Sequence, residues 1–206
     1  SPEIKHLRAL IRRLQALKDN LRQEKNRLNS GEKDVWVTND LNTHIKFLKD
    51  RINATEKEIQ DLINQNPGLK SQQDLLTSIP GIADLTARTL LAEVGDFSAF
   101  ENAPQLAAFA GLSPISHRSG SSVHKKTQVS KQGRAELRRC LYMPAVVALS
   151  SNPVIQSLAE RMTLTNHHNM EIIIAAMRKL LHLAYGVLKN QLPFDPDYGT
   201  QFNFSS

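Results

Sequence analysis

Apolar residues recur at alternating spacings of three and four positions through the first third of the chain. The first stripe comprises Ile4, Leu7, Ile11, Leu14, Leu21 and Leu28. Lys18 and Lys25 occupy two intervening seam positions, and Leu10 and Leu17 widen the apolar face. The pattern lapses at residues 29–31 and then resumes along a second stripe: Leu41, Ile45, Leu48, Ile52, Thr55, Ile59 and Leu62.

Helices with such seams bury them against another helix, either in an antiparallel hairpin or between chains. We expect Thr38 or Asn39 to cap the second helix, and Asn66-Pro67-Gly68 to end it. Residues 1–66 are therefore predicted to form a coiled coil. It would serve as a spacer or dimerisation element without active-site residues.

From Leu69 onward the pattern indicates shorter helices separated by turns. Gly95 and Gly111 are placed to end two of them, and Asn152-Pro153 caps and starts another. The last long helix, "MEIIIAAMRKLLHLAYGVLKN", is apolar on most sides and is expected to be central to the core. No segment shows convincing strand alternation. The prediction is an all-α fold, with a helical domain over 67–193 and an irregular tail over 194–206.

The turn at Ile79-Pro80-Gly81-Ile82-Ala83 lies between two of these short helices. Apolar-Pro-Gly-apolar at such a place is the pattern of a helix-hairpin-helix, which aims backbone N–H groups at a phosphate. Pro80, Gly81 and Ile82 are therefore candidate nucleic-acid contacts. The usual second glycine is replaced by Ala83, and a purely structural helical hairpin remains the alternative.

The charge of the chain is concentrated in one segment. Seven Lys and Arg residues lie between His117 and Arg139, against the one acidic residue Glu136, so this segment balances at +6. The whole chain also has a formal net charge of +6, because the other 19 cations and 19 anions cancel. The seven cations are Arg118, Lys125, Lys126, Lys131, Arg134, Arg138 and Arg139. Such concentration favours a site for a polyanion over an ordinary solvated surface.

Several other kinds of site find no support. His167-His168 has no Cys or carboxylate at ligand spacing and Cys140 stands alone, so no metal site is predicted. Glu93 and Asp96 lie three apart at a helix end, where solvated carboxylates are expected. No P-loop, dinucleotide-binding glycine pattern or Gly-x-Ser-x-Gly elbow occurs. One cysteine precludes an intrachain disulfide and suggests a reducing compartment. No apolar run is long enough to predict a membrane span, and no signal peptide is visible.

Hydroxyl groups remain as candidate nucleophiles in the predicted loop 113–133. The serines of this basic segment are Ser116, Ser119, Ser121 and Ser122. A serine hydroxyl attacks a phosphodiester only when its surroundings activate it and stabilise the charge that develops. The neighbouring cations suit that chemistry. The residues alone also allow a mobile loop that binds phosphate nonspecifically.

Several stretches together resemble one family over nearly the whole chain. They are "QEKNRL", "LLTSIPGIADLTARTLLAEVGDFSAFENAPQLAAFAGLSP", "RSG", "SKQGRAELRR", "AAMRKLLHLAYGVLK" and "PFDP". In this order they resemble the C-terminal part of transposases of the insertion-sequence one-ten / one-one-six / nine-oh-two family, relatives of the Piv-type invertases. Each motif is modest alone, but the set is specific.

The resemblance implies a DNA transposase or recombinase with a serine nucleophile that forms a 5′-phosphoserine link. The family serine lies in a Ser-Gly pair after a "GL.P" motif, so Ser119 is the candidate here. Ser121 and Ser122 compete if the register slips. The resemblance further implies DNA as partner, a bridge RNA as guide, and a homo-oligomer, dimer or tetramer, formed through the coiled coil. It places the protein in the bacterial cytoplasm, associated with the nucleoid.

One departure from the family pattern matters most. Full family chains begin with a RuvC-like domain whose DEDD carboxylates bind Mg²⁺, whereas here the heptad stripe begins at Ile4. Since the chain starts Ser-Pro-Glu, we expect an excised piece that holds no cofactor itself and is inactive alone. Two other functions stay open: a non-catalytic helix-hairpin-helix scaffold for nucleic acid, and an oligomerisation protein whose basic loop binds an acidic protein.

Overall fold

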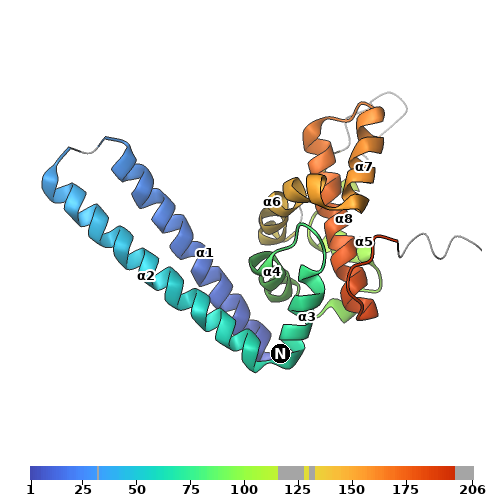
Figure 1. Ribbon diagram of the computed structural model, residues 1–206, viewed down its shortest axis with the longest axis horizontal. Helices are drawn as coiled ribbons and strands as arrows, with labels where there is room; N and C mark the ends of the chain where they lie inside the picture. The colour runs from blue at the N-terminus through green and yellow to red at the C-terminus, as the bar shows by residue number, and fades with distance from the viewer. Residues whose placement is uncertain (32, 116–127, 130–132, 198–206) are drawn as a thin grey trace, which may run out of the picture. The chain divides into compact units, whose positions relative to one another are not determined.

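The computed structural model describes residues 1–31, 33–115, 128–129 and 133–197. The chain divides into two compact units, Ser1–Lys70 and Ser71–Ser206. The described residues form eight α-helices, one 3₁₀ turn and one antiparallel pair of two-residue strands (Figure 1). The all-α prediction is confirmed, with that short strand pair as the one addition. Within the described residues, no helix is long and apolar enough to cross a bilayer.

The first unit is a hairpin of two long helices. Helix α1 (Pro2–Asn29) is capped by the Ser1 hydroxyl, and α2 (Val35–Gln65) follows a short turn and runs back along it (Figure 1). The Asp34 carboxylate caps α2 by accepting the Val37 N–H at 2.9 Å. The expectation that Thr38 or Asn39 caps this helix is therefore wrong, because the helix begins earlier and Asp34, four residues before Thr38, accepts one of its free N–H groups. Asn66 ends α2, and Pro67 begins the next helix.

The buried seam of the hairpin departs slightly from a strict heptad repeat. Leu17 and Glu24 are buried, whereas their neighbours Lys18 and Lys25 lie outside the seam. Lys18 instead pairs with Glu56 at 2.7 Å. In α2, Ile63 takes the last buried position in place of the expected Leu62. An α-helix turns every 3.6 residues, so a stripe of fixed 3.5-residue period drifts around it and neighbouring positions take over.

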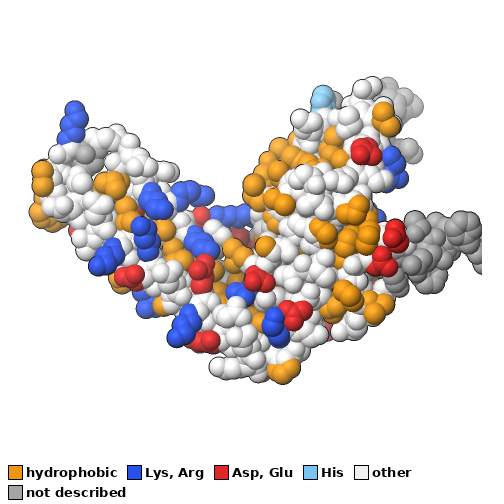
Figure 2. Space-filling view, viewed as in Figure 1, with side chains coloured by type: hydrophobic (Ala, Val, Ile, Leu, Met, Phe, Trp, Pro, Cys, Tyr) orange, Lys and Arg blue, Asp and Glu red, His pale blue; other side chains and the backbone are white. Residues whose placement is uncertain are grey.

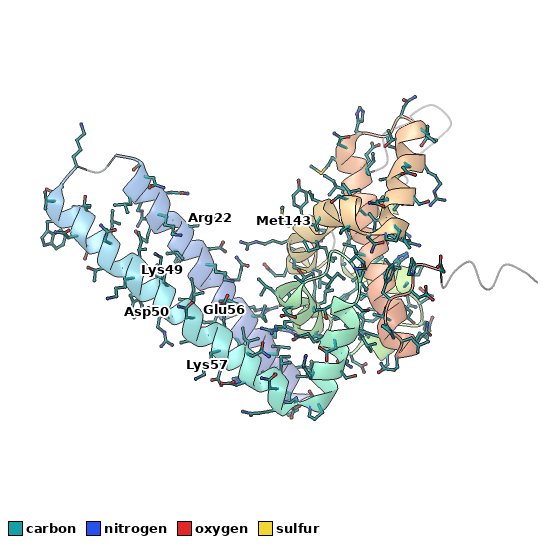
Figure 3. All side chains as sticks on the ribbon, in the orientation of Figure 1. Arg22, Lys49, Asp50, Glu56, Lys57 and Met143 are labelled. Carbon is teal, nitrogen blue, oxygen red and sulfur yellow. The ribbon has the colours of Figure 1, made fainter. Side chains whose placement is uncertain are left out.

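Charges of both signs are mixed on the surface of this unit. Figure 2 shows Lys and Arg interspersed with Asp and Glu along the visible face of the hairpin. Lys49, Asp50 and Lys57 are exposed and project from α2 (Figure 3). This intermixing agrees with the cancellation of charge outside the basic segment.

The second unit is a bundle of shorter helices arranged around α8 (Asn169–Asn190). Helix α8 packs against α5, α6, α7 and the 3₁₀ turn, and its apolar side chains are largely buried. The unit's other helical elements are α3 (Pro67–Thr77, which begins just before the unit boundary), α4 (Asp84–Val94), η1 (Phe97–Ala99), α5 (Ala103–Phe109), α6 (Ala135–Ser151) and α7 (Pro153–Leu164).

The buried Asn152 side chain connects two turns of this unit that lie far apart in the sequence. The side-chain oxygen Oδ1 of Asn152 accepts from Val154 N at 3.1 Å and Ile155 N at 3.2 Å, which caps α7 as the Asn-Pro pair predicts. Its amide nitrogen donates to Pro80 O at 3.1 Å. The corner between α6 and α7 is thereby fixed to the turn between α3 and α4.

Candidate nucleic-acid interface

Backbone contacts bring together the two ends of the basic loop 113–133. Strand β1 (Pro114–Ile115) pairs antiparallel with β2 (Gln128–Val129), in a register that sets Pro114 opposite Val129. Outside the strand pair, where the loop joins the helices, the backbones of Gly111 and Gly133 approach closely. A Cβ atom on Gly133 would lie 2.4 Å from Gly111 N, so this approach requires glycine. Gly111 itself has φ +71°, as expected of a residue that ends a helix. Segment 113–133 is thus closed at its base.

Arg134 fixes the same base to two other helices. Its backbone N–H donates to Phe109 O at 3.2 Å, and its guanidinium lies over the Phe109 ring with Cζ 5.0 Å from the centroid. Its Nη1 donates to Glu93 Oε2 at 3.1 Å, where the Glu93 side chain is only 2% exposed. A buried carboxylate is tolerated when a cation and hydrogen bonds compensate it. The ends of α4 and α5 and the start of α6 therefore meet at Arg134.

The expectation for the Glu93 and Asp96 pair is half right. Asp96 is exposed, and its carboxylate accepts from Ser98 Oγ at 2.6 Å and from Ser98 N at 2.9 Å; these two hydrogen bonds, that of the hydroxyl first, lower the pKa of Asp96. Glu93 is buried, so its interpretation as a solvated carboxylate is wrong. Its partner lies 41 positions further along the chain, and the local pattern "LAEVGD" carries no signal of that contact.

The structure describes three of the seven predicted phosphate-binding cations. Arg134 makes the contacts above, and Arg138 Nη1 donates to Ala110 O at 3.0 Å, at the end of α5. Arg139 is exposed on the same helix. Arg134 and Arg138 therefore hold α6 against α5 with part of their donor capacity. A guanidinium has five N–H donors, which leaves both side chains further donors for a phosphate.

The remaining predicted residues of the loop lie outside the described residues. These are the candidate nucleophile Ser119, its competitors Ser116, Ser121 and Ser122, and the cations Arg118, Lys125, Lys126 and Lys131. Their assignments stay predictions, supported by the sequence and by the closed base that the flanking residues form.

The predicted helix-hairpin-helix turn lies between α3 and α4 and packs against α6. Gly81 has φ +102°, and a Cβ there would lie 2.8 Å from Ala148 Cβ and 3.0 Å from Pro144 O. Ile82 is buried. Both the backbone conformation and the close approach require glycine, so internal packing accounts for this residue. Phosphate contact by Pro80, Gly81 and Ile82 stays a prediction.

Cys140 lies on α6, six residues after Arg134. Burial raises the pKa of its thiol to about 12, and the negative charges of Glu136 and Glu93 act in the same direction. A thiol in this state is neither a nucleophile nor a metal ligand at neutral pH. Among the described residues, no group of three His, Cys, Asp or Glu side chains lies close enough to hold a metal ion.

Comparison with known proteins finds a transposase family and relatives that are named as transposases or as gene-inverting proteins. Residues 73–160 match the family described as Transposase IS116/IS110/IS902 family. The chain is 38% identical over 194 residues to the pilin gene-inverting protein of Moraxella bovis, covering 94% of this chain and 59% of that relative. It is equally similar to the protein of that name from Moraxella lacunata.

A third relative is the transposase for insertion sequence element IS1111A of Coxiella burnetii. The identity is 35% over 105 residues, which cover 51% of this chain and 28% of the relative. The chain thus spans less than two thirds of the curated relatives that it matches. The match over 73–160 includes α4, α5 and α6, which form the base of the basic loop. Residues 73–160 of this chain therefore form a domain of the Transposase IS116/IS110/IS902 family.

Proposed function

We propose that this chain contributes DNA binding and a serine nucleophile to a recombinase that cleaves and exchanges DNA strands in transposition or inversion. The observation that carries the proposal is the closed base of the loop. The loop 113–133 holds four of the seven cations of the basic segment, and it begins and ends at one point, where Gly111, Gly133 and Arg134 meet. Such an anchored basic segment suits a role in holding a phosphodiester close to a serine.

In the proposed step, Ser119 Oγ attacks the phosphorus of the DNA backbone. A bond forms between Oγ and phosphorus while the bond from phosphorus to the 3′ oxygen breaks, which leaves a 5′-phosphoserine link. The hydroxyl proton of Ser119 ends on the released 3′ oxygen. Arg118, Lys125, Lys126, Lys131 and Arg134 would hold the phosphate and stabilise the charge on its oxygens, assisted by Arg138 and Arg139.

Mg²⁺ would be held by the DEDD carboxylates of a RuvC-like domain. The described residues offer no group of acidic side chains for it. We expect those carboxylates to lie outside this sequence, so this chain alone should bind nucleic acid without cleaving it. A guide RNA and homo-oligomerisation through the α1–α2 hairpin belong to the same proposal.

Two experiments test this function. If about five phosphates are engaged, the logarithm of the affinity should fall with the logarithm of salt concentration at a slope of about −4 to −5. In the full-length protein, Ser119→Ala should abolish covalent protein–DNA adducts while leaving DNA affinity nearly unchanged. Ser121→Ala is the matched control and should keep the adducts. Adducts that persist in Ser119→Ala would show that another residue is the nucleophile.

A second candidate is a nucleic-acid scaffold without catalysis. The arrangement of α3, the turn at Gly81 and α4 supports it, because two short helices joined at such a turn are the shape of a helix-hairpin-helix. A full-length protein that binds DNA with the expected salt dependence, but forms no adduct with any DNA offered, would favour this alternative.

A further inference from the structure

A group of cationic and titratable side chains lies on α8, outside the predicted basic loop. Arg178, Lys179 and His182 lie within four residues of one another on this central helix, and each is half-buried. Residues three and four apart are neighbours on a helix surface, so the three side chains share one face. The sequence "MRKLLHLAYG" places them in an otherwise apolar stretch.

These side chains lack partners among the described residues. Arg178 Nε and His182 Nε2 are both covered from solvent and make no hydrogen bond. Buried polar atoms are normally hydrogen-bonded, and each exception in a folded chain calls for an explanation. Neither Arg178 nor Lys179 forms an ion pair with a described carboxylate.

The other described cations of this unit behave differently. Arg88 donates to Gln73 Oε1 at 2.9 Å, Arg138 donates to Ala110 O at 3.0 Å, and Lys189 donates to Glu101 O at 3.1 Å. Arg161 donates to Ser157 O at 3.3 Å, and Arg134 pairs with Glu93. Unlike these cations, Arg178 and Lys179 have no described acceptor, so the positive charge on this face of α8 is uncompensated.

Electrostatics on this face favour an anion. Burial lowers the pKa of His182, and the charges of Arg178 and Lys179 lower it further. The positive charges of Arg178 and Lys179 thus oppose protonation of the His182 imidazole beside them. A bound anion would reverse that effect and would accept hydrogen bonds from the side chains of Arg178 and Lys179, which are only half-buried.

We propose that Arg178, Lys179 and His182 form a second phosphate-binding surface, separate in sequence from the loop 113–133, which holds the backbone of a nucleic-acid strand. The choice of a nucleic acid as the source of the phosphate rests on the proposed function. A guanidinium offers paired N–H donors that match two phosphate oxygens, and a neighbouring ammonium adds a point charge. Because these contacts go to the backbone, they would add affinity without sequence preference.

The test compares two double variants of this chain that remove the same charge. Arg178→Gln with Lys179→Gln changes the proposed surface. Lys49→Gln with Lys57→Gln changes two exposed lysines on the hairpin (Figure 3). Fluorescence anisotropy would measure binding to a labelled random-sequence DNA duplex, and to single-stranded RNA of the same sequence, from about 50 to 200 mM salt.

We expect the α8 double variant to bind at least one of the two probes about 10-fold more weakly at 0.1 M salt, with a slope shallower by about 2. The hairpin double variant should stay close to the unaltered chain. An effect on the duplex alone identifies the strand as DNA, and an effect on the RNA alone identifies it as RNA. Arg178→Lys, which keeps the charge, should retain the slope.

The inference is overturned if the α8 and hairpin variants behave alike on both probes while the unaltered chain keeps a steep slope. In that outcome the proposed function would stand. If the affinity of the unaltered chain does not depend on salt concentration, both the inference and the proposed function are overturned. Thermal unfolding supplies a further check, because loss of unpartnered side chains should leave the midpoint nearly unchanged. A large drop would mean that Arg178 and Lys179 serve the fold rather than a ligand.

Discussion

Glu93, near the end of α4, and Arg134, directly before α6, form an ion pair of 3.1 Å although 41 positions separate them in the chain. The Glu93 side chain is 2% exposed, whereas that of Arg134 is 38% exposed. Arg134 also lies over the Phe109 ring of α5. The pair therefore joins three helices at the point where the basic loop leaves and rejoins the bundle.

Replacing Arg134 should destabilise this unit more than an ordinary surface change. Arg134→Met would leave the Glu93 carboxylate buried without its cation. Breaking a fully buried pair costs about 3–5 kcal/mol. Because Arg134 is partly exposed, solvent screens the pair, and we expect a loss of about 1–3 kcal/mol in the free energy of unfolding. Urea denaturation monitored by circular dichroism measures this quantity.

The double variant Arg134→Met with Glu93→Gln supplies the internal control. It removes the buried carboxylate charge together with the cation that compensates it, so it should be more stable than Arg134→Met alone. Glu160→Gln, at an exposed position of α7, should change the free energy of unfolding by less than about 0.5 kcal/mol. Equal stability of the single and double variants would mean that the buried carboxylate does not depend on Arg134.

Local signals were enough to predict the helical elements of the second unit. Asn152 followed by proline, and glycine at positions 95 and 111, act through backbone groups within a few residues. The burial of Glu93 was not predictable in the same way. Its partner comes from a helix start 41 positions away, and only the tertiary fold brings the two together.

The hairpin shows a second limit of sequence patterns. The two apolar stripes correctly indicate two helices with buried seams. A heptad reading assigned Lys18, Lys25 and Leu62 to the seam, whereas Leu17, Glu24 and Ile63 are buried there. The offset of one residue follows from the helical repeat and from packing between the two helices, which depends on both sequences together.

The turn at Gly81 offers a test of the packing between α4 and α6. Gly81→Ala would place a Cβ 2.8 Å from Ala148 Cβ, at a residue with φ +102°. Both strain and overlap oppose this change, and we expect a loss of about 2–4 kcal/mol in the free energy of unfolding. Urea denaturation measures it.

The matched experiment separates overlap from backbone strain. Ala148→Gly removes the contacting Cβ, so the double variant should lose less stability than the sum of the two single variants. Strain at φ +102° would persist in the double variant. Strictly additive losses would mean that Gly81 does not contact α6 as described.

The titration of His182 provides a pH dependence whose sign follows from its surroundings. Burial is the largest cause that lowers its pKa below the ordinary value of 6.5, followed by the charges of Arg178 and Lys179. Below pH about 6.5 the unfolded chain therefore binds more protons at this residue than the folded chain does. The free energy of unfolding should fall as the pH is lowered, by at most about 1.4 kcal/mol per pH unit from this group.

Nuclear magnetic resonance of the imidazole protons, assigned with His182→Gln, measures the titration directly. We expect a midpoint below 6.5 in the unaltered chain. In Arg178→Gln with Lys179→Gln the midpoint should rise but stay depressed, because burial remains as the larger cause. Addition of the nucleic acid that binds α8 should raise the midpoint of the unaltered chain, since a nearby phosphate stabilises the imidazolium. A midpoint that does not move on saturation with DNA or RNA would place His182 away from the bound phosphate.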